Sequence, residues 1–209
     1  MSELAVVVPV KSAGKSRLSP VLSAAERRAV SLSMFRGMMG ALAGAGVIGA
    51  CRVVSSDNEV LSEAAALGAR PVPEPSDRGV NAAVRAAMDA TPEADEFLVL
   101  PSDLPLLTAA DVSALLRLKA DGPDVVLSPS LSFDGTNALL FPRVPGLSLS
   151  FDSDSYWNHL SAAAASGLSV GVCARKGIMF DVDSPDDLKA LADAKVENES
   201  AELARAAAR

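Results

Sequence analysis

The sequence alternates short apolar segments with longer amphipathic or alanine-rich segments, and this alternation constrains the fold more than any other feature. The first apolar segment, residues 4–10, is an unbroken run of small and β-branched residues, typical of a strand buried on both faces of a sheet. Residues 97–101 form a second run of this kind. Further extended segments are predicted at 51–55, 70–72, 124–128, 137–141, 169–173 and 178–182.

Helix signals lie between these strands. Ser23 with Glu26 and Thr108 with Asp111 have the spacing of capping boxes, and Ser184 precedes a proline suited to a first helical turn. Helices are predicted from Ser23 to a stop at Gly44 or Gly46, at 57–67, 79–90, 108–120 and 155–166, and from 184 onward, with 195–209 forming a terminal helix or fraying. The pattern predicts one α/β domain over 1–209, with a mostly parallel sheet covered by helices on both faces in three αβα layers.

Charge and composition disfavour some partners and bear on the location of the protein. With 19 Lys and Arg against 26 Asp and Glu, the net charge of −7 disfavours nucleic-acid binding, which needs a surplus of cations. No apolar run is long enough to span a bilayer, and the N-terminus does not resemble a signal peptide. Two isolated cysteines, Cys51 and Cys173, fit buried thiols in a reducing cytoplasm. An apolar cluster (Met34, Phe35, Met38, Met39) fits a core or a homodimer face, and core packing is the preferred interpretation.

A basic loop follows the first predicted strand. Lys11, Lys15 and Arg17 surround Gly14, and residues 1–36 hold six basic and two acidic side chains. Ligands of open α/β sheets bind beyond the carboxyl ends of strands, where such cations can bracket phosphates. The loop is no P-loop, because Val10 stands where that motif needs glycine. A phosphate site and a solvated basic loop both remain open.

Aspartates follow two later segments. Asp103 lies between prolines at the end of the second buried run, and Asp181 and Asp183 lie two residues apart, on one face of an extended segment. Carboxylates at a ligand edge suit Mg²⁺. The alternative is local structure, in which Asp103 satisfies turn amides and Asp186 and Asp187 simply suit a helix N-terminus.

Weaker signals complete the inventory. Asp134-Gly135 before Thr136 and Asn137 marks either a site or an ordinary hairpin turn. Gly79 and Asn81 open a helix, where Asn81 either contacts a nucleotide or caps the helix. Residues 151–155 open another helix, for which the spacing favours capping over anion binding. His159 is interpreted as a packed or surface helix residue rather than a base, and no Ser-His-Asp or Cys-His arrangement is supported.

Taken in order, these motifs resemble the 2-phospho-L-lactate guanylyltransferase family of coenzyme F-420 biosynthesis, over residues 4–191. The motifs that carry the resemblance are 9–11 with 15–18, 79–83, 101–106, 134–139 and 180–188. The resemblance implies a nucleotidyltransferase fold of the molybdenum-cofactor-transferase and nucleotide-diphospho-sugar transferase type, with a Rossmann-like sheet. It also implies GTP and Mg²⁺ as substrate and cofactor, and transfer of GMP to a phosphorylated three-carbon acid with release of pyrophosphate.

The resemblance also implies residue roles. Catalytic roles fall to Lys11, Lys15, Arg17 and Asp103, and nucleotide binding falls to these four together with Pro9, Gly14, Gly79 and Asn81. Metal binding falls to Asp103, Asp181 and Asp183, and acid binding to Thr136, Asn137 and Ser155. One departure stands out, because many members carry Phe-Gly-x-x-Ser where this chain has Phe151-Asp152-Ser153-Asp154-Ser155. The added carboxylates could change acid selectivity.

Three alternatives accompany this interpretation. Phosphoenolpyruvate or 3-phosphoglycerate could replace 2-phospho-L-lactate. A cytidylyl- or uridylyltransferase is disfavoured, because such enzymes usually carry a Gly-rich loop with Arg after the first strand. A catalytically silent nucleotide-binding module would be expected to lack the carboxylates at 103, 181 and 183, which are present.

Overall fold

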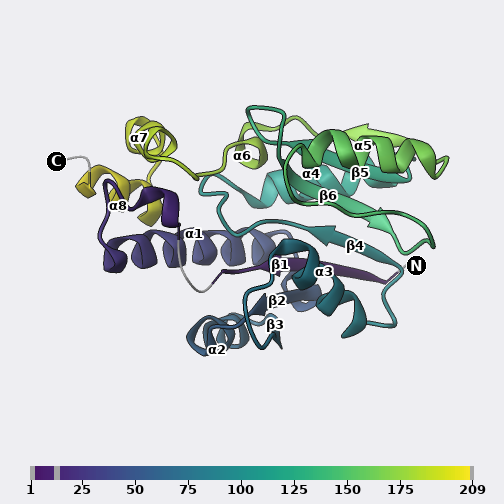
Figure 1. Ribbon diagram of the computed structural model, residues 1–209, viewed down its shortest axis with the longest axis horizontal. Helices are drawn as coiled ribbons and strands as arrows, with labels where there is room; N and C mark the ends of the chain where they lie inside the picture. Colours follow the sequence, from purple (N-terminus) through teal and green to yellow (C-terminus); the bar gives the residue numbers. More distant parts are fainter. Residues whose placement is uncertain (1–2, 12–14, 208–209) are drawn as a thin grey trace.

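The apolar segments of the sequence form the strands of one sheet, ordered β3-β2-β1-β4-β6-β5-β7 (Figure 1). The computed structural model describes residues 3–11 and 15–207. The strands are β1 (Leu4–Pro9), β2 (Cys51–Ser55), β3 (Arg70–Pro73), β4 (Glu96–Val99), β5 (Val125–Pro129), β6 (Thr136–Pro142) and β7 (Val170–Val172). The strand positions predicted from the sequence are confirmed, apart from the segment at 178–182.

One strand runs against the others. β1 pairs in parallel with β2 and β4, and the β2–β3 and β5–β7 pairs are also parallel. β6 lies between β4 and β5 and is antiparallel to both. The connection from β5 to β6 is too short for a parallel crossover, which explains the reversal. The first residues of β6 therefore lie at the edge where the parallel strands end.

Helices cover both faces of the sheet. They are η1 (Ser16–Leu18), α1 (Ala24–Gly44), η2 (Ile48–Ala50), α2 (Asn58–Ala66), α3 (Val80–Asp89), α4 (Ala109–Ala120), α5 (Ser155–Ala165), α6 (Lys176–Met179), α7 (Pro185–Asp193) and α8 (Glu199–Ala207). α1, α2 and α4 pack on one face, and α3 and α5 pack on the other. Within the described residues, no helix is long and apolar enough to cross a membrane.

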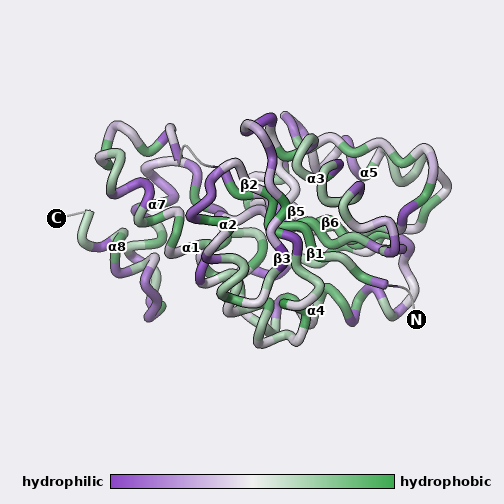
Figure 2. Tube along the Cα trace, turned by 90° about the horizontal axis from the view of Figure 1, so that it is seen from below, coloured by the Kyte–Doolittle hydropathy of each residue, from purple (hydrophilic) through white to green (hydrophobic). Residues whose placement is uncertain are grey.

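The interior strand β1 shows why the first apolar run has no polar face. Val6 and Val8 pack under α1 and α2, whereas Ala5 and Val7 face α3 and α5. Figure 2 shows this hydrophobic centre, with the hydrophilic segments toward the outside. The four residues of the predicted apolar cluster in α1 are also buried within the chain, so core packing is confirmed for them: Met34, Phe35, Met38 and Met39.

A third apolar cluster joins the C-terminal segment to the start of α1. α7 and α8 pack beside α1, away from the sheet, as the left side of Figure 1 shows. The hydroxyls of Ser33 and Ser200 are 3.0 Å apart in this contact, and Ala201 and Ala204 are fully buried. The end of the chain, for which the sequence left a helix or a frayed segment open, therefore forms a packed helix up to residue 207.

The predicted helix starts are confirmed. Ser23 with Glu26, Thr108 with Asp111, and Ser184 with Asp187 each form a reciprocal capping box. Both cysteines are buried free thiols, and burial raises the pKa of Cys51 to about 12.

The extended segment predicted at 178–182 is partly wrong, because Ile178 and Met179 belong to the short helix α6. A tertiary contact accounts for this turn: Arg175, its N-cap, donates a 2.5 Å hydrogen bond to buried Asp111 of α4. The chain continues from the turn as an irregular segment that carries Asp181 and Asp183.

Candidate active site

A large cleft opens at the sheet edge where β1 and β4 end and β6 begins. Its volume is about 1020 Å³. Its walls come from the loops after β1, β3, β4 and β5, from the starts of α3 and α5, and from the segment after α6. The antiparallel direction of β6 brings Thr136 and Asn137 to this edge, so one cleft collects most of the motifs singled out in the sequence.

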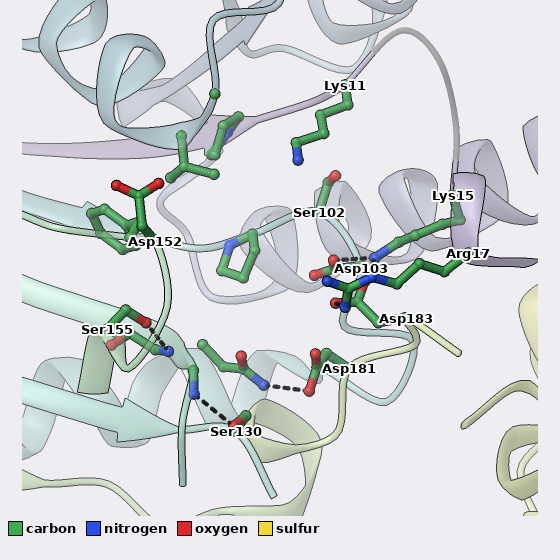
Figure 3. Close-up of a pocket in the computed structure, with 18 of the residues that line it drawn as sticks. Lys11, Lys15, Arg17, Ser102, Asp103, Ser130, Asp152, Ser155, Asp181 and Asp183 are labelled. Carbon is green, nitrogen blue, oxygen red and sulfur yellow. Dashed lines mark hydrogen bonds and ion pairs between the residues drawn. The ribbon is translucent and has the colours of Figure 1, made fainter. Parts of the chain in front are cut away.

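Cations line one side of the cleft (Figure 3). Lys11 directly follows β1, whose end is held by a 2.9 Å hydrogen bond from the Val10 amide to Val54 and by a bond from the Ser55 hydroxyl to Val10. Lys15 and Arg17 lie farther along the same loop. Arg17 is largely exposed, and its Nη1 is 3.7 Å from Asp183. The loop therefore presents three positive charges beyond the end of β1.

Lys15 is the best-anchored cation. Its ammonium contacts the carboxylates of both Asp103 and Asp183, the latter at 2.5 Å. Burial alone would lower the pKa of Lys15, but the two carboxylates outweigh it and raise the pKa above the ordinary value. Lys15 is therefore charged at neutral pH and links the loop after β1 to two acidic segments.

The acidic side is assembled from segments far apart in the sequence. Asp103 follows β4, and its backbone carbonyl accepts a 3.2 Å hydrogen bond from the Val182 amide, which fixes the segment carrying Asp183. The Asp187 carboxylate accepts bonds from the amides of Asp183 and Ser184 and secures that segment to α7. One oxygen of Asp103, Oδ1, is buried and has no partner in the described part of the chain.

Asp181 lies deeper. The Asn137 amide donates to its Oδ1 at 3.1 Å and also approaches two backbone carbonyls of α6. Burial, reinforced by Asp103 and Asp183 and opposed by the Asn137 bond, raises the pKa of Asp181 to about 6. Asp183 differs: burial acts against ionisation, yet Lys15, Arg17 and Lys11 hold its pKa below the usual range. Positive charge near Asp181 would restore its charged form.

Hydroxyl groups line the opposite side. The Ser155 hydroxyl, at the start of α5, accepts a 2.8 Å hydrogen bond from the Thr136 amide. The Ser130 hydroxyl accepts one from the Gly135 amide, and a side chain at 135 would lie 3.3 Å from Ser130. The Asp134-Gly135 pair thus closes the β5–β6 hairpin, which confirms the hairpin turn that the sequence left open as one of two interpretations. The same hairpin faces the cleft, so the turn and the site coincide.

Most predicted site residues lie together in the cleft lining: Pro9, Lys11, Lys15, Arg17, Gly79, Asp103, Thr136, Asn137, Ser155, Asp181 and Asp183. Gly14 falls outside the described residues. The Asn81 side chain does not line the cleft. Its amide nitrogen donates to Asp152 at 3.0 Å and its oxygen accepts from the Phe151 amide at 2.9 Å. Asn81 therefore ties α3 to the segment before α5.

The cleft also contains polar residues that the motifs did not assign. Glu74, Asp77, Ser102, Ser130, Ser132 and Asp152 line it. Burial, followed by the charge of Asp77, raises the pKa of Glu74, and its Oε2 is buried without a partner in the described residues. In the sequence, the only feature that points to Glu74 as a site residue is its position directly after the edge strand β3. Asp152 occupies the position where the family pattern has glycine, and its backbone needs no positive φ, unlike Asp154 at φ 56°.

Two carboxylates of the cleft could hold a divalent cation together with water and substrate. Among residues 3–11 and 15–207, no three acidic, Cys or His side chains converge closely enough to hold a metal ion by themselves. Mg²⁺, however, is usually held by one or two carboxylates together with water and substrate phosphates. Asp103, with its unpartnered oxygen, and Asp183 meet that requirement.

The αβα fold, with cations after the first strand and carboxylates after β4 and α6, suits a nucleotidyltransferase. A putative nucleotide-diphospho-sugar transferase from Desulfovibrio desulfuricans has the same fold, with a TM-score of 0.73 and 18% identity over 99% of this chain and 95% of the other. The predicted fold class is confirmed. Residues 4–204 match the family model described as guanylyl transferase CofC like, and the chain belongs to that family.

Curated relatives agree with this membership. A phosphoenolpyruvate guanylyltransferase from Rubrobacter xylanophilus is 45% identical, over 88% of this chain and 91% of its own length. A 2-phospho-L-lactate guanylyltransferase from Methanothermobacter thermautotrophicus is 38% identical, over 87% and 81%. A 3-phospho-D-glycerate guanylyltransferase from Phenylobacterium zucineum is also 38% identical, over 90% and 88%. The resemblance to guanylyltransferases found in the sequence is confirmed.

Proposed function

We propose that this protein transfers GMP from GTP to the phosphate of a phosphorylated three-carbon acid and releases pyrophosphate. The observation that carries the proposal is the cleft of a family member, in which three cations face a pair of hydroxyls across the end of β4. The cations suit a triphosphate, and the hydroxyls, with the start of α5, suit a second anion. The site thus has room and charge for two phosphorylated substrates.

The reaction needs no protein base. A phosphate monoester has a second pKa of about 6, so its oxygens are largely deprotonated near neutral pH. One such oxygen attacks the α-phosphorus of GTP and forms a new P–O–P bridge, while the bond between the α-phosphorus and its bridging oxygen breaks. Pyrophosphate leaves with that oxygen. The protein contributes alignment of the two anions and neutralisation of their charge.

The residue roles follow from position. Lys11, Lys15 and Arg17 would bind the triphosphate, and Thr136 with Ser155 would bind the acid. Asp103 and Asp183 would hold Mg²⁺, with Asp181 behind them, and the bound ion would neutralise phosphate charge. The buried, unpartnered oxygen of Asp103 supports this assignment. On substrate binding, Lys15 would exchange a carboxylate for a phosphate.

Among the acids, the relative at 45% identity favours phosphoenolpyruvate, while those at 38% keep 2-phospho-L-lactate and 3-phosphoglycerate as candidates. With 2-phospho-L-lactate the product would be lactyl-2-diphospho-5'-guanosine, on the route to coenzyme F-420. A cytoplasmic location, a homodimer and the lack of a nucleic-acid partner stay predictions, of which the first is supported by the two free buried thiols.

The test measures pyrophosphate release with Mg²⁺, each of the four nucleoside triphosphates and each of the three acids. We expect release with GTP and one of the acids. Absence of release with GTP and all three acids would refute the proposal. Asp103→Ala should lower kcat/KM at least about 100-fold with an unchanged circular dichroism spectrum, and unchanged turnover in that variant would refute the metal assignment.

A further inference from the structure

The one histidine of the chain lies directly behind the hydroxyl side of the cleft. His159, on α5, is 2% exposed, and its ring packs edge-on against Phe151 with 4.6 Å between centroids. Nδ1 is 2.9 Å from the Thr136 hydroxyl oxygen, and the Ser150 backbone amide donates to Nε2 at 3.1 Å. The imidazole therefore bridges the segment before α5 and the first residue of β6.

The two hydrogen bonds determine which nitrogen carries the proton. A backbone amide can only donate, so Nε2 must be the bare acceptor. The proton of the neutral ring then lies on Nδ1, which donates to the Thr136 oxygen. Burial lowers the pKa of His159 to about 4, which keeps the ring neutral at physiological pH. A charged ring would place a second proton against the Ser150 amide.

This arrangement assigns a direction to the Thr136 hydroxyl. Since its oxygen accepts from His159, its own proton is free to be donated elsewhere. No acceptor for that proton is found in the described part of the chain, and Thr136 lines the cleft. The Ser155 hydroxyl likewise accepts from the Thr136 amide (Figure 3), which leaves its proton free. Two hydroxyl donors thus lie side by side where an anion would bind.

We propose that His159 is a positioning residue, whose Nδ1–H group holds the Thr136 hydroxyl as a hydrogen-bond donor to the acid substrate. The proposal rests on the proposed function, which places that acid at Thr136 and Ser155. His159 touches neither substrate, so its effect should appear in acid binding and leave GTP binding unchanged. This gives the residue a role distinct from general-base catalysis.

Two substitutions separate the hydrogen bonds of the ring. An asparagine amide nitrogen lies near the position of Nδ1, so His159→Asn retains a donor to Thr136. A glutamine amide lies near Nε2, so His159→Gln keeps the partner of Ser150 but loses that donor. We expect His159→Gln to raise the KM for the acid about tenfold, with the KM for GTP unchanged. His159→Asn should restore the acid KM to within about threefold of wild type. Equal effects of the two variants would overturn the proposal.

A double-mutant cycle tests whether the effect passes through Thr136. Thr136→Val removes the hydroxyl at nearly constant volume and should itself raise the acid KM. In that background His159→Gln should have no further effect, because no hydroxyl is left to orient. Multiplication of the two single effects would contradict the proposal, since it would mean that His159 acts by another route.

A measurement without turnover keeps this inference distinct from the proposed function. Because the chain has one histidine, ¹⁵N NMR of labelled protein reports a single imidazole. At pH 7 we expect the neutral ring with its proton on Nδ1, and a shifted Nδ1 signal in Thr136→Val. A proton on Nε2, or a charged ring, would overturn the inference. If wild type transferred GMP to no acid, the proposed function and the acid-binding role would both fail, while the NMR result would still decide the hydrogen-bond arrangement.

Discussion

The ammonium of Lys15 and the carboxylate of Asp103, 88 residues apart in the sequence, form an ion pair in the centre of the cleft. Asp183 contacts the same ammonium from the other side. One cation thus balances two carboxylates proposed as metal ligands. This relationship means that removal of Lys15 should affect metal binding and turnover in opposite directions.

We expect Lys15→Met to lower kcat/KM for GTP at least about 100-fold, because the charge proposed to stabilise the transferring phosphoryl group is lost. The same variant should bind Mg²⁺ more tightly than wild type when nucleotide is absent, because Asp103 and Asp183 lose their competing cation. Isothermal titration with MgCl₂ measures the second effect. Lys189→Met, on an exposed turn of α7, is the control for loss of one positive charge. Unchanged turnover in Lys15→Met would contradict the role of this side chain.

Asp152 should reduce affinity for the acid. Its carboxylate lines the cleft in which a phosphate and a carboxylate would bind, and like charges repel. Asp152→Asn keeps an oxygen to accept from Asn81 and removes the charge. We expect the acid KM to fall about threefold at low ionic strength and the difference to shrink in salt. Asp89→Asn, at the exposed end of α3, controls for net charge. An acid KM that does not change with the substitution would refute this repulsion.

Gly177 is expected to tolerate no side chain. A Cβ there would collide with the Asp111 carboxylate and lie 2.7 Å from the Leu106 carbonyl oxygen. Gly177→Ala should displace α6, the turn that precedes Asp181, and lower the free energy of unfolding by about 2 kcal/mol. Gly40→Ala, at an exposed position of α1, has no atom within 4 Å of the new methyl group and should be neutral or stabilising by up to about 1 kcal/mol. Urea unfolding of both variants checks this, and equal stabilities would contradict it.

His159 should make stability depend on pH in a defined window. Burial lowers its pKa from 6.5 to about 4, so between these values the unfolded chain binds a proton that the folded protein does not. Stability from this group is full above pH 6.5 and is lost as the pH falls toward 4, with a slope of at most about 1.4 kcal/mol per pH unit. His159→Gln should remove this part of the slope. Urea unfolding at several pH values compares the two proteins, and parallel curves would refute the assignment.

Much of the fold could be predicted because its signals are local. The run at 4–10 predicts a strand buried on both faces, which is β1, and capping boxes at Ser23 and Thr108 predict two helix starts. The direction of β6 was not explicit in the prediction of a mostly parallel sheet, since strand direction depends on pairing. The Asp134-Gly135 turn did carry that information. The helical turn at 176–179 escaped because the Arg175–Asp111 contact that holds it is tertiary.

The site could be predicted as a set of residue types, but not as a set of contacts. Lys15, Asp103 and Asp183 were each singled out, yet nothing in their spacing showed that one ammonium joins both carboxylates. Asn81 is a polar residue at a helix start, and only the folded chain shows that its amide bonds to the 151–152 segment. The sequence favours a packed or surface position for His159 over a catalytic base. The structure shows the packed position, and the partner Thr136 lies 23 residues away on another element. Long-range pairing decides these contacts.

The residues proposed for the two substrates come from different parts of the chain, and the antiparallel strand β6 lies in the part proposed for the acid. The residues proposed for the nucleotide come from the loops after β1, β3 and β4, whereas those proposed for the acid all fall between Ser130 and His159, in the hairpin leading into β6 and the start of α5. The residues proposed to bind the acid thus lie in one continuous stretch of the sequence. Exchange of this stretch between relatives, or its diversification as a library, would leave the cations proposed to bind GTP unchanged: Lys11, Lys15 and Arg17. On these proposed roles, the choice of acid could vary while the residues assigned to the nucleotide stay the same.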